Sequence, residues 1–345
     1  MPVTIKDIAR AAGVSHATVS RALNGNSLIP ESTASAIREL ARQMGYVPSA
    51  AARGLRTNRS RAIGVIVSRI DNPYFGEVVQ GIEEALQGAG YSIFVASSYL
   101  DYGHEHSIVQ AFGEHRVDGV IIGSVTFNRE HAEILKGYGV PVVVVNNQSP
   151  RQNANAIAHD DVYGAREVTA HLIGLGHRRI AYLGNRQATR INGERLRGYR
   201  LACEENGLTP DPGLVLLSDG SEIENGESAM EELFKLPQLP DAVFCFNDLM
   251  AIGALKTLKR RGVDVPRQLS LAGFDNIPYS AYTSPALTTF DQPKLRIGFE
   301  AASLLLELIN NGNGSNGNRS TTTRRIRGEL LVRESTAENH NTEIA

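Results

Sequence analysis

Apolar residues near the start of the chain recur every three to four positions, which is the spacing of an amphipathic helix. This spacing holds over residues 4–12, 15–24 and 30–44. Gly13 and Gly45 follow the first and third stretches, at the position after a helix where glycine is favoured. The pattern predicts three short helices that bury one shared core, and so a small domain over residues 1–47.

Residues 48–60 form a different kind of segment. They hold little apolar surface, three arginines and a central Gly54. A short helix with so few apolar contacts is marginal in water on its own. We interpret the segment either as a linker or as a helix that folds only when a partner supplies a docking surface.

From residue 62 onward, apolar runs of Val, Ile and Leu alternate with helical stretches. Eight such runs are candidate strands, at residues 62–68, 91–96, 118–124, 140–146, 178–184, 214–218, 241–247 and 269–275. Nearly continuous apolar strands are typical of parallel sheets that helices cover on both faces. The two successive sets predict two doubly wound α/β lobes. Because such sheets bind ligands at the carboxyl ends of their strands, we expect a site in the cleft between the lobes.

Charge is distributed unevenly along the chain. Residues 1–60 carry eight basic and three acidic groups, a net charge of +5, whereas the 345-residue chain carries −2, so the remaining 285 residues carry −7. A basic head on an acidic body indicates that only the head meets a polyanion, although a solvated basic face would look the same. No apolar run is long enough for a membrane helix, and the first residues lack a signal-peptide pattern, so we expect a cytoplasmic protein.

The motifs of several enzyme classes are missing. Residues 174–179 come nearest to a dinucleotide-binding loop, but they lack its third glycine and precede a strand. There is no G-x-S-x-G, Walker loop or H-E-x-x-H. Two cysteines, Cys203 and Cys245, are too few for a zinc cluster. We therefore expect neither an enzyme nor a bound metal or cofactor.

Residues 5–24 have the layout of a helix-turn-helix. An alanine near the middle of the first helix allows the second helix to pack closely, Gly13 makes the turn, and Ser15 can cap the second helix. A helical hairpin of any function would share these features. The basic segment that follows favours the DNA-binding interpretation.

Motifs along almost the whole chain resemble the lactose-repressor (LacI/GalR) family of transcription factors. In order, they are TIKDIARAAGVSHATVSRALNG, AAARGLRT, IGVIVSRIDNPYF, RVDGVIIGS, IAHDDVYGAREVTAHLIGLGHRRIAYLG, ERLRGYRLACEENGL, FNDLMAIGAL, LAGFDN, ALTTFDQP and LLVREST. The resemblance implies a homodimer with helix-turn-helix headpieces, hinge helices and a sensor core like the periplasmic sugar-binding proteins. It places the headpiece at 1–47, the hinge segment at 48–60 and the core at 61–345. Within the core we expect the lobe near DNA at 61–160 and 291–320, and the distal lobe at 161–290 and 321–335.

The resemblance also assigns roles on DNA. Residues matching the family's base-reading positions are His16, Ala17 and Arg21, and a guanidinium is the natural partner of guanine. Residues expected to contact phosphates are Thr4, Ser15, Thr18, Ser20 and Asn24. In the hinge, Leu55 matches the leucine that enters the minor groove in relatives. The basic Arg53 is also expected to contact DNA. The alternative for Leu55 is an ordinary exposed linker residue.

In the core, the resemblance implies a ligand site. Its expected residues are Asn72, Tyr74, Phe75, Asn146, Asn147, Arg195, Asn247, Asp275 and Gln292. Simpler interpretations stay open: one of the two aromatic residues packs in the core, Arg195 is solvated, and Asp248 only caps a helix. Some relatives carry a charged pair where this chain has Asn146 and Asn147. The hydrogen-bond donors therefore differ, and the identity of the ligand does not carry over from those relatives. Amides suit hydroxyl groups, and we expect a small sugar.

Together these features predict a ligand-responsive repressor that binds a palindromic operator as a dimer. A transport-associated binding protein is the alternative, since it would share the core. The missing signal peptide and the basic helical head argue against it. The sequence leaves open whether the ligand is an inducer or a co-repressor.

Overall fold

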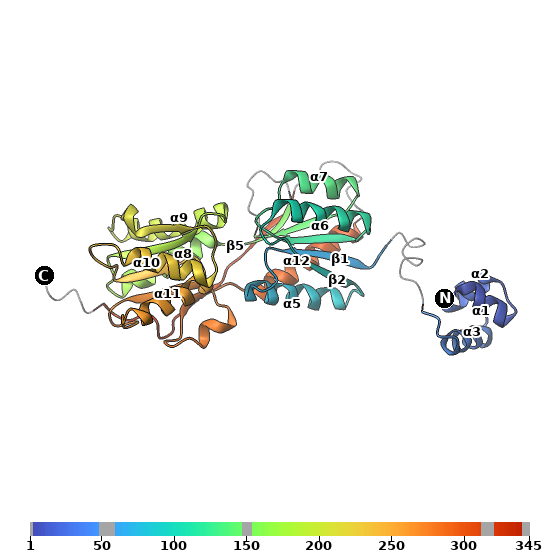
Figure 1. Ribbon diagram of the computed structural model, residues 1–345. Coiled ribbons are helices and arrows are strands. Elements are labelled where there is room, and N and C mark those ends of the chain that lie inside the picture. The colour runs from blue at the N-terminus through green and yellow to red at the C-terminus, as the bar shows by residue number, and fades with distance from the viewer. Residues whose placement is uncertain (1–2, 48–58, 147–153, 312–320, 340–345) are drawn as a thin grey trace. The chain divides into compact units, whose positions relative to one another are not determined.

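The computed structural model describes residues 3–47, 59–146, 154–311 and 321–339. It divides into two compact units, Met1–Ser60 and Arg61–Ala345, each with its own hydrophobic core. Figure 1 shows the elements of both units. Among the described residues, no helix is both long enough and apolar enough to cross a membrane.

The first unit is a bundle of three helices, as its apolar spacing predicts. They are α1 (Ile5–Ala12), α2 (His16–Leu23) and α3 (Glu31–Gln43). At the start of α1, the backbone N–H and the hydroxyl of Thr4 both donate to the Asp7 carboxylate, at 3.0 and 2.7 Å. Gly13 ends α1 with a left-handed φ of 65°, which turns the chain into α2. The shared core includes Ile8, Val19, Ala22, Ile37 and Ala41.

The second unit contains two six-stranded sheets, one in each lobe. The sheet of the first lobe is parallel throughout, in the order β11-β5-β4-β3-β1-β2. Its strands are β1 (Ala62–Val67), β2 (Ser92–Ser97), β3 (Gly119–Gly123), β4 (Val142–Val145), β5 (Asn155–His159) and β11 (Thr323–Ile326). Helices α5 (Pro73–Gln87) and α12 (Lys294–Asn310) pack on one face, and α6 (Tyr102–Glu114) and α7 (Arg129–Gly137) on the other.

The sheet of the second lobe has the order β12-β10-β9-β8-β6-β7, with only β12 antiparallel to its neighbour. Its strands are β6 (Ile180–Asn185), β7 (Val215–Ser218), β8 (Ala242–Cys245), β9 (Ser270–Asp275), β10 (Thr288–Asp291) and β12 (Glu329–Leu331). Helices α8 (Asp161–Gly174) and α9 (Thr189–Glu205) cover one face, and α10 (Ile223–Leu233) and α11 (Asp248–Arg260) the other. Short 3-10 turns lie at Pro212–Leu214 and Pro278–Ala281. The predicted pair of doubly wound α/β lobes is confirmed.

The chain crosses between the two lobes three times. The crossings run from β5 to α8, from β10 to α12 and from β11 to β12. At the third crossing, Gly328 packs against the carbonyl group of Asp291 at the end of β10, and a Cβ there would overlap the carbonyl oxygen. The third crossing therefore lies directly against the end of β10, where the second crossing begins.

Strand β11 departs from the lobe limits that we predicted. We expected residues 321–335 in the distal lobe, but Thr323–Ile326 pairs with β5 in the sheet of the first lobe. Only β12, after the third crossing, belongs to the second sheet. The prediction failed because β11 (TRRI) has no apolar run that would have shown it to be a strand.

Replacing Gly328 with alanine tests the close packing of the crossings. The added methyl would displace the backbone of β10, so we expect Gly328→Ala to lower the free energy of unfolding by about 1–3 kcal/mol in urea titrations. Gly137→Ala is the matched control, because a Cβ at that helical position meets no atom within 4 Å. Equal stability of both variants would contradict this packing.

Candidate functional site

Helix α2 presents polar side chains on the side opposite its buried residues. The Ser15 hydroxyl accepts a hydrogen bond from the Thr18 N–H at 3.0 Å and so caps the helix. Val19 and Ala22 are buried in the core of the first unit, whereas His16 and Arg21 are exposed. Residues that are half-exposed on the same helix are Ala17, Thr18 and Ser20. The helix-turn-helix is thus formed, with the predicted base-reading residues available to a partner.

Four of the five residues predicted to contact phosphates already have intramolecular partners for their side chains, and Ser15 and Thr18 are two of them. The Thr4 hydroxyl donates to Asp7, and the Asn24 side-chain amide donates to the carbonyl group of Ser20 at the end of α2. Both residues are exposed, although their backbone N–H groups also donate within the protein, that of Thr4 to Asp7 and that of Asn24 to carbonyl groups of α2. The predicted hinge residues Arg53 and Leu55 lie outside the described residues.

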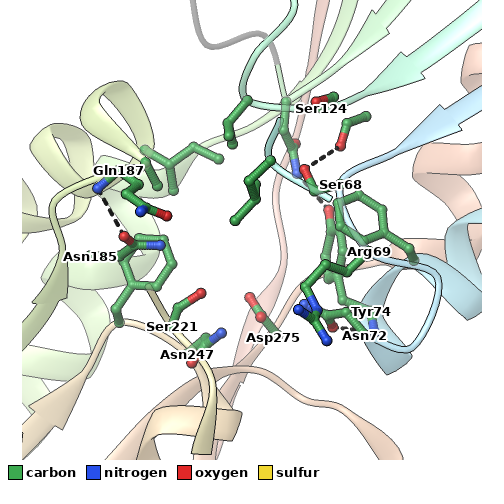
Figure 2. Close-up of a pocket in the computed structure, with 18 of the residues that line it drawn as sticks. Ser68, Arg69, Asn72, Tyr74, Ser124, Asn185, Gln187, Ser221, Asn247 and Asp275 are labelled. Atoms are coloured by element: carbon green, nitrogen blue, oxygen red, sulfur yellow. Dashed lines mark hydrogen bonds between the residues drawn. The ribbon is translucent and has the colours of Figure 1, made fainter. Parts of the chain in front are cut away.

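A pocket that is open to solvent lies between the lobes of the second unit, with about 780 Å³ of space that includes part of this solvent. Figure 2 shows side chains of the first lobe, such as Tyr74 and Ser124, facing those of the second, such as Asn185 and Asn247. Predicted ligand residues that line this pocket are Asn72, Tyr74, Phe75, Asn146, Arg195, Asn247 and Asp275. Gln292 lies behind Asp275 rather than in the lining, and Asn147 lies outside the described residues.

Asn72 and Pro73 place two aromatic rings at the start of α5. The Asn72 side chain accepts from the Tyr74 N–H at 3.0 Å, and Pro73 is the first helical residue. The rings of Tyr74 and Phe75 meet edge to face, with centroids 5.2 Å apart. Tyr74 is buried in the core of the first lobe, so the core interpretation holds for its ring, whereas Phe75 is only partly buried.

The Tyr74 hydroxyl joins the two lobes. It accepts from the Asn146 side-chain amide at 2.6 Å and donates to the Gln292 side-chain oxygen at 3.4 Å. Burial, together with the nearby Asp275, raises the pKa of Tyr74 well above its usual value, so the hydroxyl keeps its proton. Asn146 adopts a left-handed φ of 53° just after β4, a conformation that asparagine tolerates well, and its oxygen accepts from the His159 N–H.

Arg195 is buried, so the solvated interpretation of this residue is wrong. Its guanidinium lies over the rings of Phe274 and Phe246, with its central carbon 3.9 and 4.5 Å from their centroids. Its Nε donates to the Asp161 carboxylate at 2.8 Å, and one terminal nitrogen donates to the Phe246 carbonyl oxygen. Its other terminal nitrogen lies 3.5 Å from Asp275. Burial acts to lower the pKa of Arg195, but the two carboxylates raise it.

Asp275 ends β9 in a strained conformation at the base of the pocket. Its φ is 107°, which is rare for a residue other than glycine. The Gln292 amide donates to its carboxylate at 2.6 Å, and the buried Lys294 ammonium donates to its carbonyl oxygen at 2.7 Å. Burial raises the pKa of Asp275 to about 6, against the opposing effect of Arg195. The carboxylate is therefore ionised at neutral pH and can accept hydrogen bonds from a ligand.

Asn247 and Asp248 have different roles. Asn247 lines the pocket and caps α11 by accepting from the Met250 N–H at 2.9 Å. Asp248 points away from the pocket lining: it accepts from the Ile277 N–H at 2.8 Å and from the Thr289 hydroxyl at 2.6 Å. Burial and the nearby Asp275 raise the pKa of Asp248 to about 8. Asp248 thus holds the segment after β9, and the capping role belongs to its neighbour.

Several pocket residues were missed. They are Ser68, Arg69, Ser124, Asn185, Gln187, Ser221, Glu222 and Phe246. Ser68 and Ser124 directly follow β1 and β3, and Asn185 ends β6, so the rule that ligands bind at strand carboxyl ends could have found them. Arg69 and Glu222 come from opposite lobes and approach to 3.7 Å, a contact that no sequence spacing reveals.

Asp248 should make the stability of the protein depend on pH. In the folded chain it holds its proton up to about pH 8, whereas its ordinary pKa is 3.8. The free energy of unfolding should therefore fall as pH rises from about 4 to 8, and this contribution is fully present only below pH 4. In Asp248→Asn, we expect the fall between pH 5.5 and 8 to be smaller by about 2–3 kcal/mol.

Urea titrations at several pH values measure this difference. The exposed Asp264 provides the control, and Asp264→Asn should keep the wild-type dependence on pH. An unchanged slope in Asp248→Asn would show that this carboxyl group ionises normally in the folded protein.

Comparisons with known proteins found matches to both the first unit and the core of the chain. Residues 4–49 match the family described as bacterial regulatory proteins, lacI family, and residues 169–336 match a periplasmic binding protein-like domain. The chain is 34% identical over 332 residues to the HTH-type transcriptional repressor PurR of Haemophilus influenzae (strain PittEE), covering 96% of this chain and 98% of that protein. The PurR repressor of Actinobacillus pleuropneumoniae serotype 3 (strain JL03) is 35% identical, over 89% and 91% of the two chains.

Solved structures of similar proteins include the lac repressor dimer bound to operator and the anti-inducer ONPF. It superposes with a TM-score of 0.85 at 25% identity, covering 98% of this chain and all of that one. A complex of the regulator CelR with cellobiose gives 0.70 at 29% identity, over 96% and 99%. A LacI family regulator from Enterococcus faecium with bound ribose gives 0.71 at 27%, over 80% and 99%. This chain belongs to the LacI family of bacterial transcriptional repressors, with an N-terminal helix-turn-helix region and a ligand-binding core, and is not an enzyme.

Proposed function

We propose that this repressor binds a palindromic operator as a homodimer in the cytoplasm, and that a small sugar bound between the core lobes controls its affinity for DNA. A two-fold symmetric protein places its two recognition helices on two symmetric half-sites. In this proposal His16, Ala17 and Arg21 read base edges. Residues that contact phosphates in this proposal are Thr4, Ser15, Thr18, Ser20 and Asn24.

The observation that carries the sugar proposal is the composition of the pocket. Asp275 offers an ionised acceptor at its base, and the lining around it supplies amides and hydroxyls from both lobes. Sugar hydroxyls both donate and accept, so they suit such a mixed set. Phe75 and Phe246 add apolar rings against which a sugar face can pack. Two structural relatives hold cellobiose and ribose, which supports the same class of ligand.

A nucleobase is the second candidate for the pocket. Its flat ring could lie against Phe75 or Phe246, and its N–H groups could donate to Asp275. The same polar groups would serve either ligand class, so a direct comparison of sugars and bases separates the two.

Effector binding would act through the angle between the lobes. Because the pocket takes side chains from both lobes, a bound ligand favours the lobe arrangement in which both sets reach it. Coupling of this kind typically changes DNA affinity by about 5- to 150-fold. A fall in operator affinity on adding the sugar identifies an inducer, and a rise identifies a co-repressor.

The role of Arg21 can be tested on an operator selected from random DNA. Loss of a bidentate contact to guanine should weaken operator binding by Arg21→Ala by about 1–3 kcal/mol, with a smaller loss on unrelated DNA. Fluorescence anisotropy at one fixed salt concentration measures both affinities. Arg38→Ala is the control, because Arg38 is also exposed, lies on α3 and pairs there with Glu31. Equal losses in the two variants would show that Arg21 contributes charge alone.

The ligand class can be tested by thermal unfolding with ribose, glucose, cellobiose, adenine and guanine. A ligand at about 100 times its dissociation constant stabilises the folded protein by about 2.7 kcal/mol, so we expect one of the sugars to raise the melting temperature. Asp275→Asn should remove this shift, while Asp219→Asn, an exposed carboxylate of the same lobe, should keep it. A shift with a base and with none of the sugars would replace the sugar proposal by the second candidate.

A further inference from the structure

A buried ion pair lies beneath the pocket, and one of its members is absent from the pocket lining. Asp161, the first residue of α8, accepts from Arg195 at 2.8 Å. Both side chains are at most 5% exposed. Asp161 directly follows the first crossing between the lobes, so the pair joins the pocket to that crossing.

The close approach of α8 and α9 creates this contact. Gly198 packs so tightly against α8 that a Cβ would overlap the carbonyl oxygen of Val162. Arg195 lies three residues before Gly198 and therefore on the same face of α9. The backbone contact thus brings Nε of Arg195 within hydrogen-bond distance of the Asp161 carboxylate.

Asp161 is also connected to the first lobe. The Nδ1 atom of His159 lies 3.7 Å from its carboxylate, and the backbone N–H of His159 donates to the Asn146 side chain. Asn146 in turn donates to Tyr74. The ion pair is therefore one part of a polar chain that leads back to the aromatic residue at the start of α5.

The three nitrogens of Arg195 face three different groups, two carboxylates and one backbone carbonyl. Nε donates to Asp161 and one terminal nitrogen donates to Phe246, while the remaining nitrogen is 3.5 Å from Asp275, beyond a short hydrogen bond. Burial acts to raise the pKa of Asp161, but Arg195 and His159 outweigh it and keep the pKa below its usual value. Asp161 therefore stays ionised and holds the guanidinium, and Asp275 is left as an acceptor at the base of the cavity.

We propose that Asp161 is a positioning residue of this pocket: it holds Arg195 away from Asp275, so that Asp275 accepts hydrogen bonds from the effector instead of from the guanidinium. This inference rests on the proposed effector site, and it adds a residue that acts on the site from outside the pocket lining. Without the carboxylate at position 161, the Arg195 guanidinium would form a closer ion pair with Asp275, whose carboxylate oxygens would then no longer be free to accept from the effector. Effector affinity would then fall although every residue of the pocket lining is unchanged.

The first arm of the test needs no ligand. The carboxyl group of Asp275 is titrated by ¹³C NMR in the full-length protein, with Asp275→Asn to assign its signal. Charged or titratable groups that interact with it are Arg195, Asp161, Lys294, Asp248 and Tyr74. In Asp161→Asn we expect the pKa of Asp275 to fall from about 6 by one unit or more, because the negative charge of Asp161 no longer raises it and because Arg195 forms a full ion pair with it. The same substitution in the Arg195→Gln background measures the first effect alone, so a larger fall with Arg195 present reports the new pairing.

Asp160→Asn is the matched control for this arm. Asp160 lies in the same crossing, caps α8 through the Tyr163 N–H and pairs with Arg327, and asparagine caps helices as well as aspartate does. Its variant should leave the pKa of Asp275 unchanged. An unchanged or higher pKa of Asp275 in Asp161→Asn would overturn the proposal.

The second arm measures affinity by calorimetry for whichever of ribose, glucose, cellobiose, adenine or guanine stabilises the wild-type protein. We expect Asp161→Asn to bind it about tenfold or more weakly and Asp160→Asn to bind it normally. In the Arg195→Gln background, Asp161→Asn should cause no further loss, because Asp161 acts through Arg195. Additive losses would assign it a general role in stability and contradict the proposal.

The two arms separate this inference from the proposed function. If none of the five compounds stabilises the wild-type protein, the proposed ligand classes fail, and the titration of Asp275 still decides the role of Asp161. If a compound binds and Asp161→Asn changes its affinity neither in the wild-type protein nor in the Arg195→Gln background, the effector site stands and the positioning role is refuted.

Discussion

The structure of the core depends on balancing the charges that are buried where the chain crosses between its lobes. Arg195 and Lys294 are buried cations, and Asp161, Asp248 and Asp275 are buried carboxyl groups. An unpaired charge in such a place is costly. Arg195 lies beside Asp161 and Asp275, and Lys294 pairs with Asp291 and Glu77, whereas burial raises the pKa of Asp248 to about 8. Each buried cation thus has carboxylate partners, and the buried charges also accept or donate hydrogen bonds that fix the crossing segments.

Much of the fold could be predicted because buried parallel strands are continuous apolar runs. β1, β6 and β9 are buried along their whole length and were found in this way. β5, β10, β11 and β12 were not found, since they are short and carry His159, Thr288 or Arg324 where a central strand would be apolar. These four strands lead into or out of the crossings. Their polar residues make tertiary contacts: His159 lies near Asp161, Thr288 bonds to Ser335 and Thr336, and Arg324 pairs with Glu300 and Glu307. These contacts therefore replace the apolar pattern that would have revealed the strands.

The candidate site was predictable wherever a polar side chain ends an apolar strand. Asn247 and Asp275 follow this rule, and the family resemblance added Arg195 and Gln292. Asp161 and Lys294 could not be recognised, because each lies in the first turn of a helix and looks there like an exposed charge. Only the packing of α8 on α9, and the hydrogen bonds from Lys294 to the ends of β9 and β10, show that both are buried. Burial that arises from contacts between distant segments has no local signature in a sequence.

The contact at Gly198 has a consequence for how the pocket responds to motion. Because α8 and α9 meet there backbone to backbone, no side chain can change its rotamer to alter their spacing. The base of the pocket, formed by Arg195 and Asp275 of the second lobe, therefore behaves as a fixed template, while Tyr74 and Asn146 belong to the first lobe and travel with it. Ligand binding would then occur in two steps. The ligand would first bind to the rigid surface of the second lobe, and the first lobe would then move onto the bound ligand and carry the change to the rest of the protein.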